Sequence, residues 1–139
     1  MGVKEYKITF RTRGFTDIKN ITEEIKEKVN ESGYKEGIAV VFVPGATGGV
    51  TTMEYEPGVI RDLQEALEKI APQTGKYHHD YRWGDGNAYA HIRSAIIGSS
   101  VSIPFSNGNL QLGMWQSVVF IDFDNKPRRR ELIVKILGE

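Results

Sequence analysis

The sequence has 139 residues and no net charge, since 18 basic residues balance 18 acidic ones, and it contains no cysteine. The lack of cysteine excludes disulfides, thiolate catalysis and cysteine-ligated zinc. The balanced charge disfavours nucleic acid and anionic membranes as partners, and no apolar run reaches the roughly 20 residues of a membrane span. Because the N-terminal residues lack the apolar core of a signal peptide, we expect a cytoplasmic protein.

The first third of the chain predicts a strand, a helix and a second strand. Apolar and polar residues alternate over 6–10, which is typical of a half-buried strand. Asp17 is expected to cap a helix that continues through 18–29 and ends at Gly33. The β-branched run over 38–43 predicts a strand covered on both faces.

A glycine-rich turn over 44–49 leads into an extended segment over 50–56. Pro57 opens a second helix that ends before Pro72. Its apolar residues recur at helical spacing and predict a buried stripe of Val59, Leu63, Leu67 and Ile70.

The second half predicts a third helix and more strands. Asn87 is a plausible N-cap for a short helix that Gly98 ends. A strand follows over 101–105, and Asn107-Gly108 is a strong hairpin signal, so we expect residues 115–123 to form the returning strand with Trp115 in the core.

A final strand carries Leu132, Val134 and Ile136 after a turn over 124–127. The elements together predict one domain over residues 1–139. Its class is α+β, with a mostly antiparallel mixed sheet and two or three helices.

All three histidines lie within residues 75–94, where they accompany several acidic residues. Imidazoles transfer protons or bind metals near neutral pH, so His79 and His91 are candidates for either role. Asp85 and Glu54 can complete a nitrogen and oxygen ligand set for zinc, manganese or a similar ion. Histidines that are merely exposed or hydrogen-bonded are an equally weighted alternative, and Asp85 also fits a simple turn.

Groups suited to an anion lie in the glycine-rich segment and further along the chain. Glycine-rich turns let backbone N–H groups approach a phosphate, although this segment lacks the lysine of a Walker loop. The tri-basic run over 128–130 fits a solvated or ion-paired turn, with anion recognition as the alternative. The expected substrate-binding residues are Thr47, Thr51, Thr52, Asn87, Arg93 and Gln116.

Four segments resemble the YjbQ family of small bacterial and archaeal proteins. They read VFVPGATGGVTTMEYEPG, KYHHDYRWGDGNAYAHIRSAIIGSSVSIPF, NGNLQLGMWQSVVFIDFD and RRRELIVKILGE, and they cover nearly the whole chain in order. The resemblance implies an α+β fold and a homotrimer. It also implies an activity of the secondary thiamine-phosphate synthase type, which condenses a pyrimidine pyrophosphate with a thiazole phosphate.

The family's polar site is similar to a histidine triad near a subunit interface. Two of its histidines correspond to His79 and His91, accompanied by Glu54, Asp85 and Asn87. Gly45 stands where the family has its first histidine, and Glu56 is a candidate substitute. A site with two histidines and a carboxylate still suffices for a metal.

We therefore expect an enzyme that acts on a small phosphorylated substrate, with no nucleic-acid or membrane partner. The expected catalytic residues are His79, His91, Asp85 and Glu54, and the expected ligands of a divalent metal such as zinc are His79, His91 and Glu54. The alternative is a non-catalytic trimer that binds a small ligand or a metal through the same residues.

Overall fold

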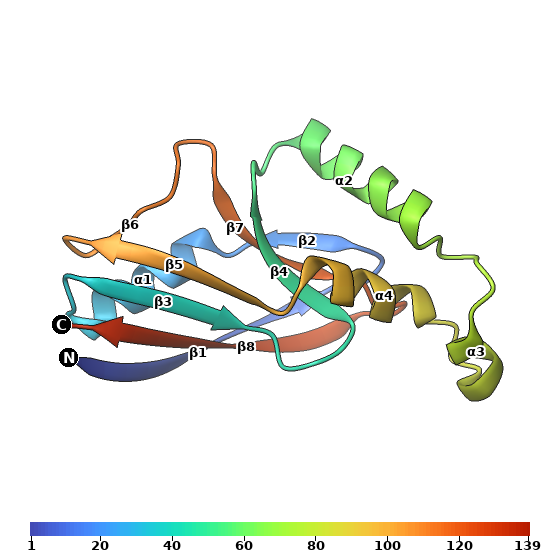
Figure 1. Cartoon of the computed structure of the whole chain (residues 1–139), viewed down its shortest axis with the longest axis horizontal. Helices are drawn as coiled ribbons and strands as arrows, with labels where there is room; N and C mark the ends of the chain where they lie inside the picture. Colours follow the sequence, from blue (N-terminus) through green and yellow to red (C-terminus); the bar gives the residue numbers. More distant parts are fainter.

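Two antiparallel sheets and four helices make up the chain (Figure 1), and the computed structural model describes all 139 residues. The strands are β1 (Gly2–Thr12), β2 (Asp17–Asn20), β3 (Gly37–Phe42), β4 (Gly48–Met53), β5 (Ser100–Ser106), β6 (Asn109–Leu110), β7 (Ser117–Asp122) and β8 (Arg128–Gly138). The helices are α1 (Thr22–Ser32), α2 (Pro57–Ile70), α3 (His78–Trp83) and α4 (Ala88–Ile97).

The larger sheet has the strand order β1-β8-β3-β5-β6 and the smaller one β2-β7-β4. Strands β1 and β8 pair along their whole length, with Gly2 opposite Gly138 and Thr12 opposite Arg128. The two termini therefore lie side by side at one end of the molecule, and α3 lies at the other end (Figure 1).

The smaller sheet is buried on both faces, because alternate side chains of β7 enter two different cores. Val118 and Phe120 belong to a core of 15 buried residues shared with α1 and the larger sheet. Val119 and Ile121 belong to a second core of 8 buried residues, which includes Leu67 of α2. Tyr89 and Ala90 of α4 complete that second core, so α2 and α4 cover the outer face of the smaller sheet.

Helix α1 begins later than the sequence predicts. Residues 17–20 pair with β7 as strand β2, and Asp17 accepts a hydrogen bond from the backbone N–H of Arg13. The side chain of Asn20 accepts hydrogen bonds from both the backbone N–H and the hydroxyl of Thr22. The prediction that Asp17 caps this helix is wrong, whereas Gly33 does end it, with a left-handed φ of 75°.

Two expectations for the strands are also wrong. Strand β3 is covered on one face alone, since Ile38 and Phe42 on the other face are 46% and 43% exposed. The strand that returns from the Asn107-Gly108 hairpin is the two-residue β6, while β7 pairs with β2 and β4 in the other sheet.

The helices after Pro57 follow the predicted order, with one addition. Helix α2 starts at Pro57, but Leu67 is its one buried residue and Ile70 is 61% exposed. The short helix α3 lies in a segment for which no helix is predicted, so there are four helices rather than two or three. The α+β class, the single domain and the antiparallel pairing are confirmed. None of the helices combines the length and apolar character needed to span a membrane.

Candidate functional site

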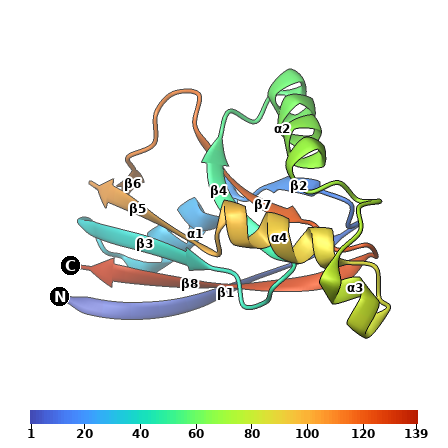
Figure 2. The same ribbon diagram turned by 45° about the vertical axis from the view of Figure 1, so that its right-hand side comes forward.

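Helices α3 and α4 bring two of the three histidines into contact. His79 lies on α3 and His91 on α4, and their ring centroids are 4.7 Å apart with the ring planes tilted by 44°. Gly84 ends α3 in the left-handed conformation, so the chain can turn back toward α4 within a few residues. Helix α3 lies at the end of the molecule away from the termini, and α4 runs from the middle of the molecule toward that end (Figure 2). His78 is exposed and stands outside this pair.

Two carboxylates flank the His79 ring. The Nδ1 atom of His79 lies 3.3 Å from Oδ1 of Asp80 and 3.5 Å from Oδ1 of Asp85. Asp80 also accepts a hydrogen bond from the backbone N–H of Ala88, the first residue of α4. Asp80 thus joins the two helices that carry the histidines, which is a role that sequence reasoning missed. Its position directly after His79 was the one available signal.

The backbone after α3 is held by the turn between β7 and β8. The side-chain amide of Asn125 donates to the carbonyl oxygen of Asp85 at 2.9 Å. Asn87 does precede α4 as predicted, but its side chain makes no capping hydrogen bond. Its Oδ1 atom is buried and has no partner in the chain.

The donor atoms here suit a divalent cation. One nitrogen of His79 and one oxygen each of Asp80 and Asp85 lie within 4.8 Å of one another. Imidazole nitrogen with carboxylate oxygen is a ligand set that zinc and manganese accept. The ring of His91 lies against that of His79, but His91 is not among the three residues whose donor atoms converge.

A hollow of about 290 Å³ adjoins His91. Its walls come from the loop before β4, from α4 and from the connection between α4 and β5, and they consist of Gly45, Ala46, His91, Ser94, Ala95, Gly98 and Ser99. The small side chains of these residues leave the space open, and none of them is acidic. The hydroxyl of Ser94 is already engaged, because it donates to the carbonyl oxygen of Gly48.

Glu54 lies away from the histidines, in a second hollow of about 450 Å³ at the other end of β4. The six residues of β4 span roughly 17 Å at ~3.3 Å per residue, which separates this hollow from the one beside His91. Within one chain, the predicted metal ligands His79, His91 and Glu54 therefore do not converge.

Gln116 and Thr52 share the second hollow with Glu54. The side-chain amide of Gln116 donates to the hydroxyl of Thr52, and its Oε1 accepts from the backbone N–H of Gly113. Trp115 lines the same hollow and is 71% exposed, so the prediction that it lies in the core is wrong. Thr51 is half-buried in the middle of β4, opposite Val119.

Glu56 has a structural role as the N-cap of α2. Its carboxylate accepts hydrogen bonds from the backbone N–H groups of Gly58 and Val59 at 2.8 and 2.9 Å. These two bonds hold the pKa of Glu56 below its ordinary value of 4.5. The carboxylate is thus committed to the helix and does not replace a missing histidine.

Arg93 is buried and faces away from the hollow. Its Nε and Nη2 atoms donate to the carbonyl oxygen of Ala71, and Nη2 also donates to Glu68 at 2.6 Å. Nη1 donates to the hydroxyl of Thr16. Since these bonds tie α4 to the end of α2 and to the start of β2, the expectation that Arg93 binds substrate is not supported by its position.

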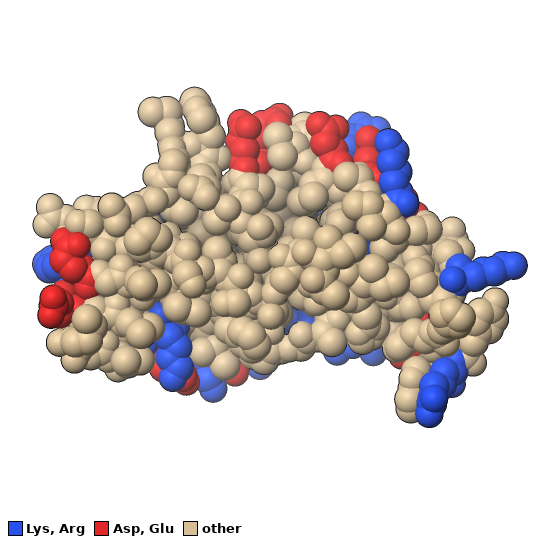
Figure 3. All heavy atoms as spheres, in the orientation of Figure 1, with Lys and Arg blue, Asp and Glu red and all other residues tan.

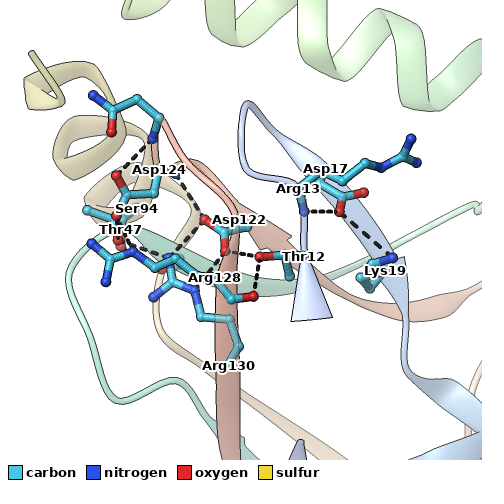
Figure 4. A network of polar contacts seen from close by, with 12 residues as sticks. Thr12, Arg13, Asp17, Lys19, Thr47, Ser94, Asp122, Asp124, Arg128 and Arg130 are labelled. Carbon is cyan, nitrogen blue, oxygen red and sulfur yellow. Dashed lines mark hydrogen bonds and ion pairs between the residues drawn. The ribbon is translucent and has the colours of Figure 1, made fainter. Parts of the chain in front are cut away.

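Thr47 belongs to a buried polar network between the two sheets (Figure 4). Its hydroxyl donates to Asp124 at 3.1 Å and accepts from Nη2 of Arg130 at 2.9 Å. Arg128 donates to Asp124, and Arg130 donates to Asp122 through two nitrogens. Sequence reasoning missed the two acidic members, of which Asp122 is the last residue of β7 and Asp124 lies two residues later.

The pKa of Asp124 lies below its ordinary value of 3.8. Burial alone would raise it, but the hydrogen bonds from Asn125, Thr47 and Arg128, together with the charge of Arg128, outweigh burial. The network therefore holds Asp124 as a carboxylate, and the oxygens of that carboxylate already accept hydrogen bonds from Asn125, Thr47 and Arg128.

Comparison of this chain with known proteins identifies one family. The family model "UPF0047 protein YjbQ-like" matches residues 6–139. UPF0047 protein MJ1081 of Methanocaldococcus jannaschii is 37% identical over 135 residues, which are 96% of this chain and 94% of that protein.

Two crystal structures have the same fold. An uncharacterized conserved protein of the yjbq/upf0047 family from Clostridium acetobutylicum is 39% identical, with a TM-score of 0.87 over 95% of this chain and 99% of that one. Hypothetical protein APE1520 from Aeropyrum pernix K1 is 32% identical, with a TM-score of 0.90 over 98% of this chain and 99% of that one. The chain belongs to the YjbQ (UPF0047) family.

Proposed function

We propose that this chain is an enzyme that acts on a small phosphorylated molecule, with a divalent metal held by His79, His91 and Asp85. The observation that carries the proposal is the contact of the His79 ring with both His91 and two carboxylates, beside an open hollow. A divalent cation bound there would supply positive charge that stabilises a departing phosphate or pyrophosphate.

The side chains around the histidines divide into ligands and supports. Asp85 is about half exposed and turns one oxygen toward His79, so it is free to bind a cation. Asp80 is more buried and already accepts the N–H of Ala88, so it orients His79 and fixes α3 against α4. The hollow beside His91 offers the space for the substrate.

The finer form of the proposal is a transferase of the secondary thiamine-phosphate synthase type. Its support is the resemblance of the sequence, together with the proximity of a cation site to a hollow lined by small residues. In that reaction a thiazole phosphate displaces pyrophosphate from a pyrimidine pyrophosphate, so charge on the leaving group would be the main demand on the site.

A homotrimer is the assembly that we propose for the site. Figure 3 shows a broad face without charged side chains over β5 and α4. Ile92 and Ile96 of α4 are exposed on the helix that carries His91, and Phe42 is exposed on β3. An uncharged face with exposed apolar side chains is typical of an interface. Packing between copies would also offer a way to bring Glu54 of one chain toward the histidines of another.

Metal analysis of protein purified without a histidine tag tests the metal site. We expect one zinc or manganese ion per chain after equilibration, and at least a tenfold weaker affinity in His79→Ala and in Asp85→Asn. The matched control is His78→Ala, because His78 is adjacent in sequence but exposed, and its affinity should equal that of the wild type. Equal affinity in all four proteins would exclude this site.

Turnover separates the enzyme from the non-catalytic alternative. The assay supplies a pyrimidine pyrophosphate and a thiazole phosphate and measures pyrophosphate release, with His91→Ala and His78→Ala compared. Release that depends on His91 and on added metal supports the transferase. Metal binding without release from this or other phosphorylated substrates supports a binding protein instead.

A further inference from the structure

We propose that the hollow beside His91 binds a phosphate-type oxyanion through Nη1 of Arg130, which Gly45 leaves uncovered. This inference deepens the proposed function, because it assigns the group that would hold the phosphate of its substrate. It also replaces Arg93, which the structure commits to other partners.

The guanidinium of Arg130 has two N–H donors left over. A guanidinium carries five N–H groups. Nε donates to Oδ2 of Asp122 at 2.8 Å, and Nη2 donates to Oδ1 of Asp122 at 2.8 Å and to Thr47 at 2.9 Å. The two N–H groups of Nη1 have no acceptor in this chain. Because Nε and Nη2 are bound to Asp122 and Thr47, Nη1 is the nitrogen of the guanidinium that is free to hold a ligand.

The position of Arg130 is fixed before any ligand arrives. Its residue is only 9% exposed, and its guanidinium lies over the ring of Phe120, 5.7 Å from the ring centroid. The guanidinium groups of Arg128 and Arg130 lie together near Thr47, which belongs to the loop before β4 (Figure 4). A charged group held in one orientation loses little side-chain entropy when an anion binds.

Gly45 connects this arginine to the hollow. A Cβ atom at position 45 would lie 3.5 Å from Nη1 of Arg130, and apart from Gly45 and its two chain neighbours no other residue has a heavy atom within 4 Å of it. Gly45 is also a wall residue of the hollow that contains His91. A larger side chain here would cover Nη1. Arg130 is not itself a wall residue, so an anion in the hollow would reach Nη1 past Gly45, whose φ of 146° disfavours other residues.

The chemistry of the hollow favours an oxyanion over a cation. Its walls offer the imidazole of His91, the hydroxyl of Ser99 and small apolar groups, with no carboxylate among them, while the hydroxyl of Ser94 is bound to Gly48. Asp122 and Asp124 are matched by Arg128 and Arg130, so the network behind Gly45 adds no net negative charge. The two N–H groups of Nη1 point in different directions, so they can donate to an oxyanion as single charge-assisted hydrogen bonds, which are among the stronger hydrogen bonds in proteins.

Titration with inorganic phosphate and pyrophosphate in the presence of EDTA tests the inference. We expect calorimetry to detect binding to the wild type. We also expect the side-chain ¹⁵N–¹H signals of one arginine to shift when the anion is added, and these signals should be missing from the spectrum of Arg130→Lys. That variant keeps the positive charge near Asp122 but lacks Nη1, so its affinity should fall by about tenfold or more. Arg128→Lys is the matched control, since Arg128 belongs to the same network but donates to Asp124, and it should bind like the wild type.

A second variant keeps the test independent of the buried ion pair. Gly45→Ala places a methyl group against Nη1 and should weaken phosphate binding without removing any charge. Acetate provides the comparison between oxyanions, and we expect it to bind at least tenfold more weakly than phosphate.

The result that overturns the inference is phosphate affinity that stays the same in Arg130→Lys and Gly45→Ala, or absent binding by the wild type. Because EDTA removes metals, this outcome is separate from failure of the metal site. Phosphate binding with no metal affinity would overturn the proposed metal role alone.

Discussion

Asp122 and Arg130 join the two sheets through a bidentate ion pair. Both carboxylate oxygens of Asp122, on β7 of the smaller sheet, accept from nitrogens of Arg130, on β8 of the larger sheet, at 2.8 Å. Asp122 is fully buried and also accepts from the hydroxyl of Thr12 on β1. Three strands from two sheets are therefore fixed by one carboxylate.

Removal of the Asp122 charge should strongly destabilise the fold. In Asp122→Asn the buried guanidinium of Arg130 loses its counter-ion, and breaking such a pair costs about 3–5 kcal/mol. Urea unfolding followed by circular dichroism measures the loss. Asp62→Asn, at an exposed carboxylate on α2, is the control and should change stability by less than about 0.5 kcal/mol. Similar values for the two variants would contradict the role assigned to Asp122.

Asp124 should make the fold sensitive to acid. Its pKa is lowered in the folded protein, so its contribution to stability is fully present above the ordinary value of 3.8 and is lost as the pH falls through the lower folded value. The free energy of unfolding, measured by urea titration between pH 6 and pH 2, should fall in this acidic range. The fall should be smaller in Asp124→Asn, although that variant is less stable at pH 6. Parallel curves for the two proteins would show that Asp124 is not the responsible group.

Two tyrosines should respond in opposite ways to loss of their hydroxyl. Tyr89 is buried and its hydroxyl has no partner, so Tyr89→Phe should leave stability unchanged or raise it by up to ~1 kcal/mol. The hydroxyl of Tyr77 donates to the carbonyl oxygen of Pro72 at 2.6 Å, so Tyr77→Phe should lower stability by ~1 kcal/mol. Thermal unfolding of the two variants makes the comparison. A marked loss in Tyr89→Phe would indicate a bound water molecule or ligand at that hydroxyl.

Arg93→Met should damage the fold and leave the site intact. The variant leaves the carbonyl oxygen of Ala71 and the hydroxyl of Thr16 without their donor, and we expect a loss of about 2–4 kcal/mol. At a temperature where the variant is folded, its phosphate and metal affinities should equal those of the wild type. A reduced phosphate affinity in the fully folded variant would show that Arg93 does contribute to substrate binding.

Local patterns predict the elements that depend on local physics. The alternation around Ile8 and Val134 predicts β1 and β8, because one face of each strand is buried and the other is wet. Pro57 fixes the start of α2 since its ring suits the first turn of a helix. Asn107-Gly108 predicts the turn between β5 and β6, and Asn107 adopts the positive φ that such a turn requires.

The errors concern partners that are distant in sequence. The local sequence around Asp17 predicts a helix cap, but β7, about 100 residues later, pairs with residues 17–20 and makes them strand β2. The sequence predicts that Arg93 binds an anion, but in the fold its guanidinium donates to Glu68 and Ala71 at the end of α2. For the site, the sequence brings His79, His91 and Asp85 into one short segment, but it cannot tell that Glu54 lies at the far end of β4.

The full-length pairing of β1 with β8 sets an order of events during synthesis. The first strand leaves the ribosome long before its partner exists, and β8 also separates β1 from every other strand of the larger sheet. Until residues 128–138 emerge, β1 has no strand neighbour and its apolar side chains, such as Ile8, have no finished core to enter. Long-range pairing of this kind slows folding and prolongs the exposure of unpaired strands. The nascent chain therefore depends on its last eleven-residue strand to protect its first.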